Sequence, residues 1–172
     1  MIYPNGHVDY LMYKDGIELL GVAKVTMPSI KYKTVTATGA GLMGEATIPL
    51  ASMIDPMTLG IDFSSVTDAI VQLGTNEWHD VILYAADQYF DSVTRKEELE
   101  QVRFEMSIRP TEINQGTIQT ASAADASGVY SVCNYTVYKD GKKVMDIDQF
   151  NQIHEVNGVD NAAKVRQALG MM

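Results

Sequence analysis

The chain has 172 residues, the size of a single domain, so residues 1–172 are expected to fold as one unit. Hydrophobic residues make up 46% of it, which is enough for a buried core. The net charge of −9 argues against a protein that grips nucleic acid, because such proteins need clustered lysine and arginine. No apolar run approaches the ~20 residues that span a bilayer. The single cysteine, Cys133, excludes an internal disulfide, which fits folding in a reducing cytoplasm.

Residues 1–8 contain a proline and a glycine, which predicts an N-terminal arm whose order depends on a neighbour. Asp15-Gly16 then lies between two β-prone runs. An Asp-Gly pair in this setting predicts a hairpin, because glycine tolerates the positive φ that tight turns require. The tetrapeptide Tyr-Lys-Asp-Gly recurs at residues 138–141 and predicts a second turn of the same chemistry.

Residues 29–50 form the most distinctive stretch. Two arms rich in threonine, valine, isoleucine and tyrosine flank a glycine-rich tip at residues 39–44, which predicts a long β-hairpin. An arm of roughly eight residues reaches about 26 Å, which is long enough to project beyond a compact body. The apolar alternation slips near Thr34, and a bulge or a change of packing partner explains such a slip.

The hairpin tip carries Leu42 and Met43, apolar side chains in a place where a loop is normally polar. Exposed apolar groups on a protruding tip indicate docking against another chain. The sequence equally allows an ordinary hairpin that folds over its own core.

A strand at residues 54–63 is predicted to lead into a short helix. Ser65 and Asp68 have the spacing of a capping box, and apolar residues follow at helical spacing over residues 66–73. Gly74 then provides a stop signal for the helix.

Residues 101–110 alternate between apolar and polar side chains, which predicts a half-buried antiparallel strand. The apolar side consists of Val102, Phe104, Met106 and Ile108. The polar side consists of Gln101, Arg103, Glu105, Ser107 and Arg109. The charged residues 91–98 before it are predicted to be a loop, and a short strand is considered at residues 117–120.

Strands at residues 129–138 and 142–149 follow. A C-terminal helix is expected over residues 160–170, with Asp160 as its cap, because a carboxylate accepts N–H bonds at the positive end of a helix. Strands dominate, so the predicted fold class is mainly β. The expected architecture is a β-sandwich or partly closed antiparallel barrel with one short internal helix, a C-terminal helix and a protruding hairpin.

The sequence lacks the convergent reactive groups of an enzyme. His7, His79 and His154 are isolated, and none falls in a zinc-binding spacing. Cys133 lies in a predicted strand, where a free cysteine usually serves as a small hydrophobe. We therefore expect no catalytic residue, no metal site and no cofactor.

The most specific motif is C-terminal: Asn157-Gly158-Val159-Asp160, followed by a helical segment that ends in Val165-Arg166-Gln167-Ala168-Leu169-Gly170. The early Asp-Gly turn, Met27-Pro28 before the long hairpin and the glycine-rich tip precede it in order. Together these features resemble the major tail tube proteins of contractile phage tails, the P2-type tube family. The tube proteins of related contractile injection particles and R-type bacteriocins are similar.

This resemblance implies a structural subunit of an inner tube, in which stacked hexameric rings surround a central lumen. It implies that the partners are further copies of the chain, a contractile sheath protein, and baseplate and tail-terminator proteins. DNA or other cargo is expected to pass through the lumen without specific binding. The location implied is a phage tail or tail-like particle, made and assembled in the bacterial cytoplasm. An acidic protein suits DNA passage, because like charges repel within a Debye length of about 8 Å.

Two groups of residues are expected to carry such an assembly. The hairpin contacts between subunits and rings are expected at Thr34, Val35, Thr36, Gly39, Gly41, Leu42, Met43, Gly44 and Glu45. The lumen candidates are the polar side of the 101–109 strand (Gln101, Arg103, Glu105, Ser107 and Arg109), for which plain outer surface is the alternative, and secondly Asp146 and Asp148. The rival function is a monomeric small-ligand-binding β-barrel. Within the tube class, the sequence does not separate a phage tail from a headless particle.

Overall fold

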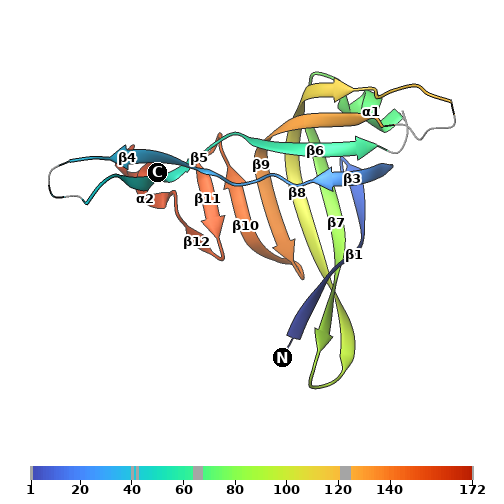
Figure 1. The fold of residues 1–172 in the computed structure, drawn as a ribbon, viewed down its shortest axis with the longest axis horizontal. Helices are drawn as coiled ribbons and strands as arrows, with labels where there is room; N and C mark the ends of the chain where they lie inside the picture. Colours follow the sequence, from blue (N-terminus) through green and yellow to red (C-terminus); the bar gives the residue numbers. More distant parts are fainter. Residues whose placement is uncertain (1, 40, 42, 64–67, 121–124, 172) are drawn as a thin grey trace.

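Long antiparallel strands build the centre of the computed structural model, which describes residues 2–39, 41, 43–63, 68–120 and 125–171. The main sheet has the strand order β12-β11-β10-β9-β8-β7-β1-β2 (Figure 1). The bounds of these strands are Ile2–Lys14 (β1), Glu18–Leu20 (β2), His79–Asp91 (β7), Lys96–Asn114 (β8), Ser127–Lys139 (β9), Lys142–Asp148 (β10), Ile153–Val156 (β11) and Val159–Asp160 (β12).

The sheet divides at β9. On one side β9 pairs with β8, whereas on the other side its residues 127–132 pair with β6 (Met57–Phe63) and its residues 134–139 pair with β10. β6 in turn pairs with β3 (Val22–Thr26), which follows β2 in the chain. The sheet therefore curls over itself without closing into a barrel among the described residues. The prediction of a mainly β fold is confirmed.

The core lies between the main sheet and the layer that β3 and β6 form over it, here called the curled layer. The predicted alternation in β8 is confirmed, because Met106 and Ile108 are buried and their neighbours in sequence are not. Val81 from β7 packs in the same cluster, and Leu59 and Ile61 of β6 complete it from the curled layer. Burial of these aliphatic side chains supplies most of the driving force for folding.

Helix α1 (Asp68–Leu73) lies over one end of this core, with Ala69, Ile70 and Leu73 buried. These are positions of the apolar stripe that the sequence predicts. The other half of the predicted capping box, Ser65, lies outside the described residues.

Helix α2 (Ala163–Ala168) is shorter than the predicted helix over residues 160–170. Its N-cap residue is Ala162, which makes no side-chain cap. Asp160 instead accepts a hydrogen bond from the backbone N–H of Ala162 at 2.9 Å and pairs with Arg166. Asp160 therefore stabilises the residues just before α2, and it is not the N-cap of this helix.

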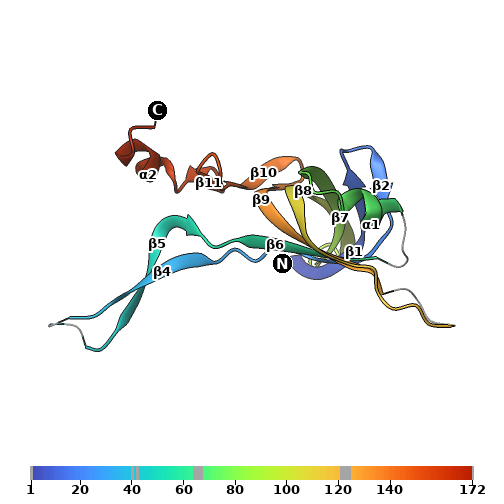
Figure 2. The ribbon, with the colours of Figure 1, turned by 90° about the horizontal axis from the view of Figure 1, so that it is seen from above.

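Strands β4 (Tyr32–Ala37) and β5 (Ala46–Ile54) form a separate two-stranded sheet. Figure 2 shows this hairpin extending away from the main sheet, which confirms the predicted protruding hairpin. Tyr32 pairs with Ile54, but Thr34 pairs with Pro49, so the register shifts between them. The slip predicted near Thr34 is this irregularity, where β5 carries extra residues.

Three segments differ from their sequence-based expectations. Residues 2–8 belong to β1 and pair with the end of β7, so they have a partner within the chain. Residues 96–98 continue β8 rather than forming a loop, because they pair with residues 89–91 of β7. Residues 117–120 form no strand. The first two strand segments arise from long-range pairing, which a local pattern does not reveal.

Candidate assembly surfaces

The β4–β5 hairpin has one apolar face and one polar face. Val35 pairs with Ile48 and Ala37 with Ala46, so these four side chains share a face. Val35 and Ile48 remain 51% and 53% exposed, because none of the described elements outside the hairpin covers them. The opposite face carries Thr34, Thr36, Thr47 and Pro49.

The predicted contact residues thus occupy both faces and the tip. Met43 is fully exposed, and the glycines and the glutamate around it are also exposed. Leu42 lies outside the described residues. The exposed residues of this set are Thr34, Val35, Thr36, Gly39, Gly41, Met43, Gly44 and Glu45.

The base of the hairpin is tied to β11 through a buried histidine, which the sequence analysis did not connect with the hairpin. Nε2 of His154 lies 3.2 Å from the hydroxyl of Tyr32, and Nδ1 lies 3.4 Å from Oγ of Ser52. The rings of His154 and Tyr32 also pack together, with centroids 5.6 Å apart. This set of contacts sets the position at which the hairpin leaves the body.

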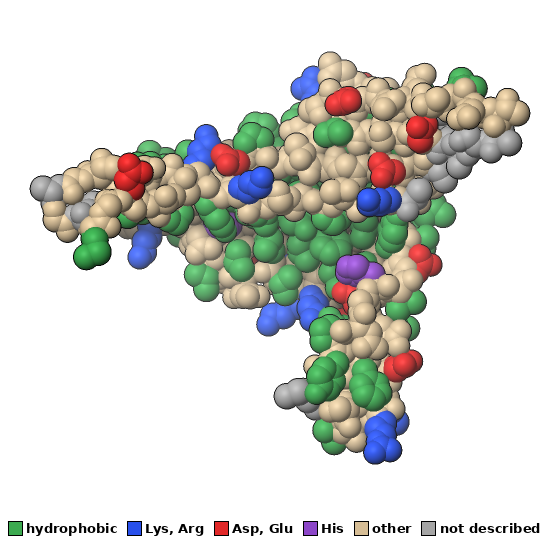
Figure 3. All heavy atoms as spheres, viewed as in Figure 1, with side chains coloured by type: hydrophobic (Ala, Val, Ile, Leu, Met, Phe, Trp, Pro, Cys, Tyr) green, Lys and Arg blue, Asp and Glu red, His purple; other side chains and the backbone are tan. Residues whose placement is uncertain are grey.

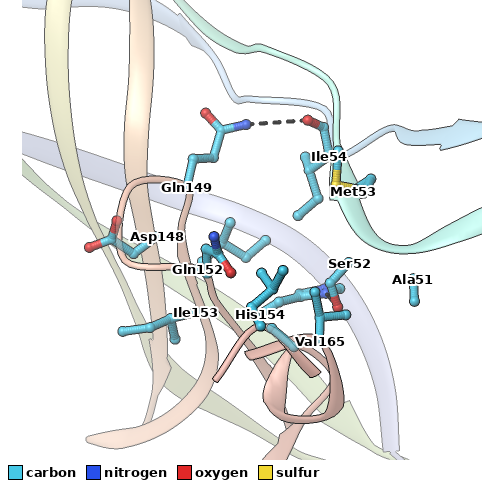
Figure 4. Close-up of a pocket in the computed structure, with 13 residues that line it drawn as sticks. Ala51, Ser52, Met53, Ile54, Asp148, Gln149, Gln152, Ile153, His154 and Val165 are labelled. Carbon is cyan, nitrogen blue, oxygen red and sulfur yellow. Dashed lines mark hydrogen bonds between the residues drawn. The ribbon is translucent and has the colours of Figure 1, made fainter. Parts of the chain in front are cut away.

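A pocket of about 330 Å³ lies beside this contact, between β5, β11 and α2. Figure 4 shows Ser52, His154 and Val165 turned toward its interior. The side-chain amide of Gln149 donates hydrogen bonds to the carbonyls of Ile54 and Asp55 and so holds the end of β5. The pocket therefore lies among the contacts that attach the base of the hairpin to β11.

The lumen candidates from β8 and from β10 lie on the same face of the main sheet, here called the polar face. Glu105 pairs with Thr136 of β9, and Thr136 pairs with Asp146 of β10. Ser107 and Asp148 both pair with Asn134 in the same way. Directly paired residues of an antiparallel sheet point to one side, so two candidates that the sequence treats separately form one surface.

Charges on the polar face are largely paired with one another. Arg103 contacts Glu105 at 3.1 Å and lies 4.1 Å from the ring centroid of Tyr138. Nζ of Lys143 lies 2.9 Å from Asp146 and 3.4 Å from Glu155. The hydrogen bond to Asp146 raises the pKa of Lys143 and keeps it protonated. The face therefore offers neutralised pairs rather than a strip of free cations.

Two lumen candidates also have local structural roles. Burial alone would raise the pKa of Asp148, but hydrogen bonds from the turn that follows β10 outweigh this effect and lower it. Those donors are the backbone N–H groups of Phe150 and Asn151, each at 2.9 Å. Arg109, at the far end of β8, donates a hydrogen bond to Asn76 at 3.0 Å.

In the described ranges no three His, Cys, Asp or Glu side chains are grouped so that they could hold a metal ion. His79 is buried and bonds to Thr75, and Cys133 is half-buried in β9. Burial raises the pKa of the Cys133 thiol, which disfavours the reactive thiolate. None of the described helices is long and apolar enough to cross a membrane.

The fold recurs in solved structures of contractile injection systems. A chain of the sheath–tube complex of the PVC extracellular contractile injection system matches with a TM-score of 0.51 at 13% identity, over 75% of this chain and 87% of that one. A chain of the tube-terminating cap of the anti-feeding prophage matches with a TM-score of 0.53 at 13% identity, over 75% and 87%. These matches show that the chain shares its fold with components of contractile injection systems.

Sequence comparison gives the family. The model described as phage tail tube protein FII matches residues 8–170, so the chain belongs to this family. The tail tube protein of Escherichia phage P2 is 28% identical over 170 residues, covering 93% of this chain and 94% of the phage protein. The resemblance found in the sequence is confirmed, and the chain is a structural tail tube protein. The comparisons lend no support to a small-ligand-binding barrel.

Proposed function

We propose that this chain builds the inner tube of a contractile particle as stacked hexameric rings, and that it catalyses no reaction. Residues 1–172 act as one tube-forming domain, and residues 29–50 form the hairpin that joins subunits and rings. Residues 1–8 extend one end of the domain, and residues 160–170 carry the C-terminal helix. The location is a phage tail or tail-like particle that assembles in the bacterial cytoplasm.

The observation that carries this proposal is the continuous polar face. It joins Arg103, Glu105, Ser107 and Arg109 of β8 with Asp146 and Asp148 of β10 through β9. Gln101 continues it by the alternation of side chains along β8. We assign it to the lumen, because a ring of subunits placed edge to edge carries such a face around its inner wall. Pairing between subunits also covers sheet edges that would otherwise stay open.

The charge of this face fits a passage that does not bind its cargo. Lys143 and Arg103 are engaged by carboxylates, so few cations remain to hold phosphate groups. DNA or other cargo therefore meets a wall of neutral and acidic groups, in keeping with the net charge of −9.

The partners proposed for the tube come from the settings of the similar folds. A sheath–tube complex, a cap and a baseplate are the settings in which the similar folds were solved. For this chain we propose a contractile sheath protein around the tube, and baseplate and terminator proteins at its ends.

Imaging of the purified full chain tests self-assembly. Negative-stain micrographs should show six-fold rings or rods with a central channel. A protein that stays monomeric at high concentration would contradict the proposal.

Thiol accessibility tests the lumen assignment. In a Cys133→Ser background, Gln101→Cys places a thiol on the polar face and Thr58→Cys places one on the exposed side of β6. In assembled rods, a small maleimide should label both thiols, but a maleimide on a 5-kDa polymer (roughly the size of a small domain) should label only Thr58→Cys. Equal labelling of the two variants by the large reagent would place the polar face outside.

A further inference from the structure

Two exposed aromatic side chains meet on the side of the main sheet that carries the polar face. The rings of Trp78 and Phe150 contact edge to face, with centroids 6.1 Å apart and planes at 89°. Trp78 is 45% exposed and Phe150 is 72% exposed. Figure 3 shows the opposite, core side of the sheet, where apolar side chains gather over the middle. The aromatic pair is not part of that core, so core packing does not explain it.

Strand order places this pair across two strands. Trp78 immediately precedes β7, and Phe150 follows β10, so β8 and β9 lie between them in the sheet. His79 is buried in the core, whereas Asp80 lies on the polar face and accepts a hydrogen bond from Ser107. By the alternation of side chains, Trp78 points to the same side as Asp80. The two rings therefore meet above β8 and β9 at one end of the polar face.

Two carboxylates flank the aromatic pair. Asp80 follows Trp78 by two residues, and Asp148 accepts a hydrogen bond from the backbone N–H of Phe150 at 2.9 Å. Burial raises the pKa of the Cys133 thiol, and the charges of Asp148 and Asp80 raise it further, so both carboxylates lie near this thiol. Neither carboxylate forms an ion pair within the part of the chain that the structure describes.

One cation lies at this end of the polar face. Nε of Arg109 donates a hydrogen bond to Oδ1 of Asn76 at 3.0 Å, so its partner is neutral. The two carboxylates outnumber this guanidinium, and the surroundings of the rings are net negative. The face of an aromatic ring also attracts cations. Perpendicular rings beside carboxylates therefore favour an ammonium or guanidinium group and disfavour phosphate.

We propose that the Trp78–Phe150 pair and its two flanking carboxylates bind the lysine and arginine side chains of a polypeptide. We call this arrangement the aromatic site. Polypeptides carry cations on their side chains, whereas nucleic acids present phosphates. Cation–π contacts at exposed sites are weak, so the site holds a passing chain only briefly. Its role on a lumen wall rests on the proposed tube function, and there it favours basic polypeptide cargo over DNA.

Fluorescence of the full chain tests the aromatic site directly, because Trp78 is the only tryptophan. A hexaarginine peptide is titrated at about 0.15 M salt, where long-range attraction is screened. The peptide should change the Trp78 emission in a saturable manner. Hexaglutamate and a short DNA duplex at the same concentrations should leave the emission unchanged. An equal change with either anionic probe would overturn the assignment to cations.

Matched variants separate the aromatic site from the general acidity of the chain. Phe150→Leu keeps an apolar side chain and should raise the dissociation constant of the peptide about two- to fivefold, which is the size of an exposed cation–π contact. Asp80→Asn should weaken binding in the same direction. The controls are Phe90→Leu and Glu97→Gln, at two residues that pair with each other at the other end of β7 and β8, and both should bind as the natural chain does. Equal weakening in all four variants would refute the site.

The site lies within one chain, so the outcomes separate it from the tube function. Specific peptide binding by a chain that forms no rods would overturn the tube function and the lumen role, and leave the binding site standing. Normal rods, with no response to hexaarginine before or after assembly, would overturn the site and leave the tube function standing. If only the unassembled chain responds, and the Trp78 emission shifts to shorter wavelength in rods, a neighbouring subunit covers the rings and the cargo role is overturned.

Discussion

The hydroxyl of Tyr32 lies 3.2 Å from Nε2 of His154, although 122 residues separate them in the sequence. Tyr32 begins β4, and His154 is buried in β11. Together with the contacts of Ser52 and Gln149, this contact joins the base of the projecting hairpin to the C-terminal part of the sheet.

Tyr32→Phe should weaken this junction. The ring packing is retained, but a buried histidine nitrogen loses its partner, which costs about 1–2 kcal/mol of unfolding free energy. Urea denaturation measures the change. Tyr3→Phe, at an exposed tyrosine in β1, is the control. Equal stabilities of the two variants would show that the Tyr32 hydroxyl does not stabilise the attachment of the hairpin to β11.

Acid should destabilise the protein below about pH 4. The pKa of Asp160 is lowered by its hydrogen bond to Arg166, and the pKa of Asp148 is lowered despite its burial. A lowered folded-state pKa means stability that is present above the ordinary value of 3.8 and is lost as the pH falls through the folded-state value.

Asp148→Asn separates the contribution of this carboxylate. We expect a loss of about 1 kcal/mol at pH 7, because charged hydrogen bonds to the turn become neutral ones, and a shallower loss of stability on acidification. Denaturation curves between pH 2 and about pH 7 measure both. Asp62→Asn, at an exposed position of β6, serves as the control. An acid response unchanged from that of the natural chain would contradict the role of Asp148.

The hairpin tip should be needed for assembly and not for folding. Met43 is fully exposed, and the tip makes no described contact with the body. Met43→Asp, or deletion of residues 39–44, should therefore leave the thermal unfolding transition of the protomer unchanged. Both changes should reduce the number and length of rods in micrographs. Rods of normal length after the deletion would exclude a docking role for the tip.

Gly128→Ala should destabilise the fold. A Cβ at this position would lie 2.5 Å from the hydroxyl oxygen and 2.6 Å from Cε2 of Tyr130, a fully buried side chain that has no room to move. Overpacking of this kind costs about 1–3 kcal/mol. Gly21→Ala is the matched control, since apart from its chain neighbours no described atom lies within 4 Å of its Cβ position. The comparison is made by urea denaturation, and equal midpoints would contradict the packing argument.

Local physical chemistry made part of this structure predictable from the sequence. Asp15 and Asp140 have φ angles of 50° and 46° and are each followed by a glycine with positive φ, as the Asp-Gly pairs predict. The alternation around Met106 predicted a one-sided strand, and the slip near Thr34 predicted the irregular hairpin. In each case neighbours in the sequence determine the conformation.

The tertiary structure decided what depends on distant partners. Only the register through β9 places Glu105 and Asp146 on one face, and only the pairing of β9 with both β6 and β10 brings β6 over the main sheet. The pairing of residues 2–8 with β7 and the bond from Tyr32 to His154 are likewise invisible in any short window. Strand register is set by the packing of the whole sheet, so a pattern of side chains shows which residues share a face of one strand but not which strand lies beside it.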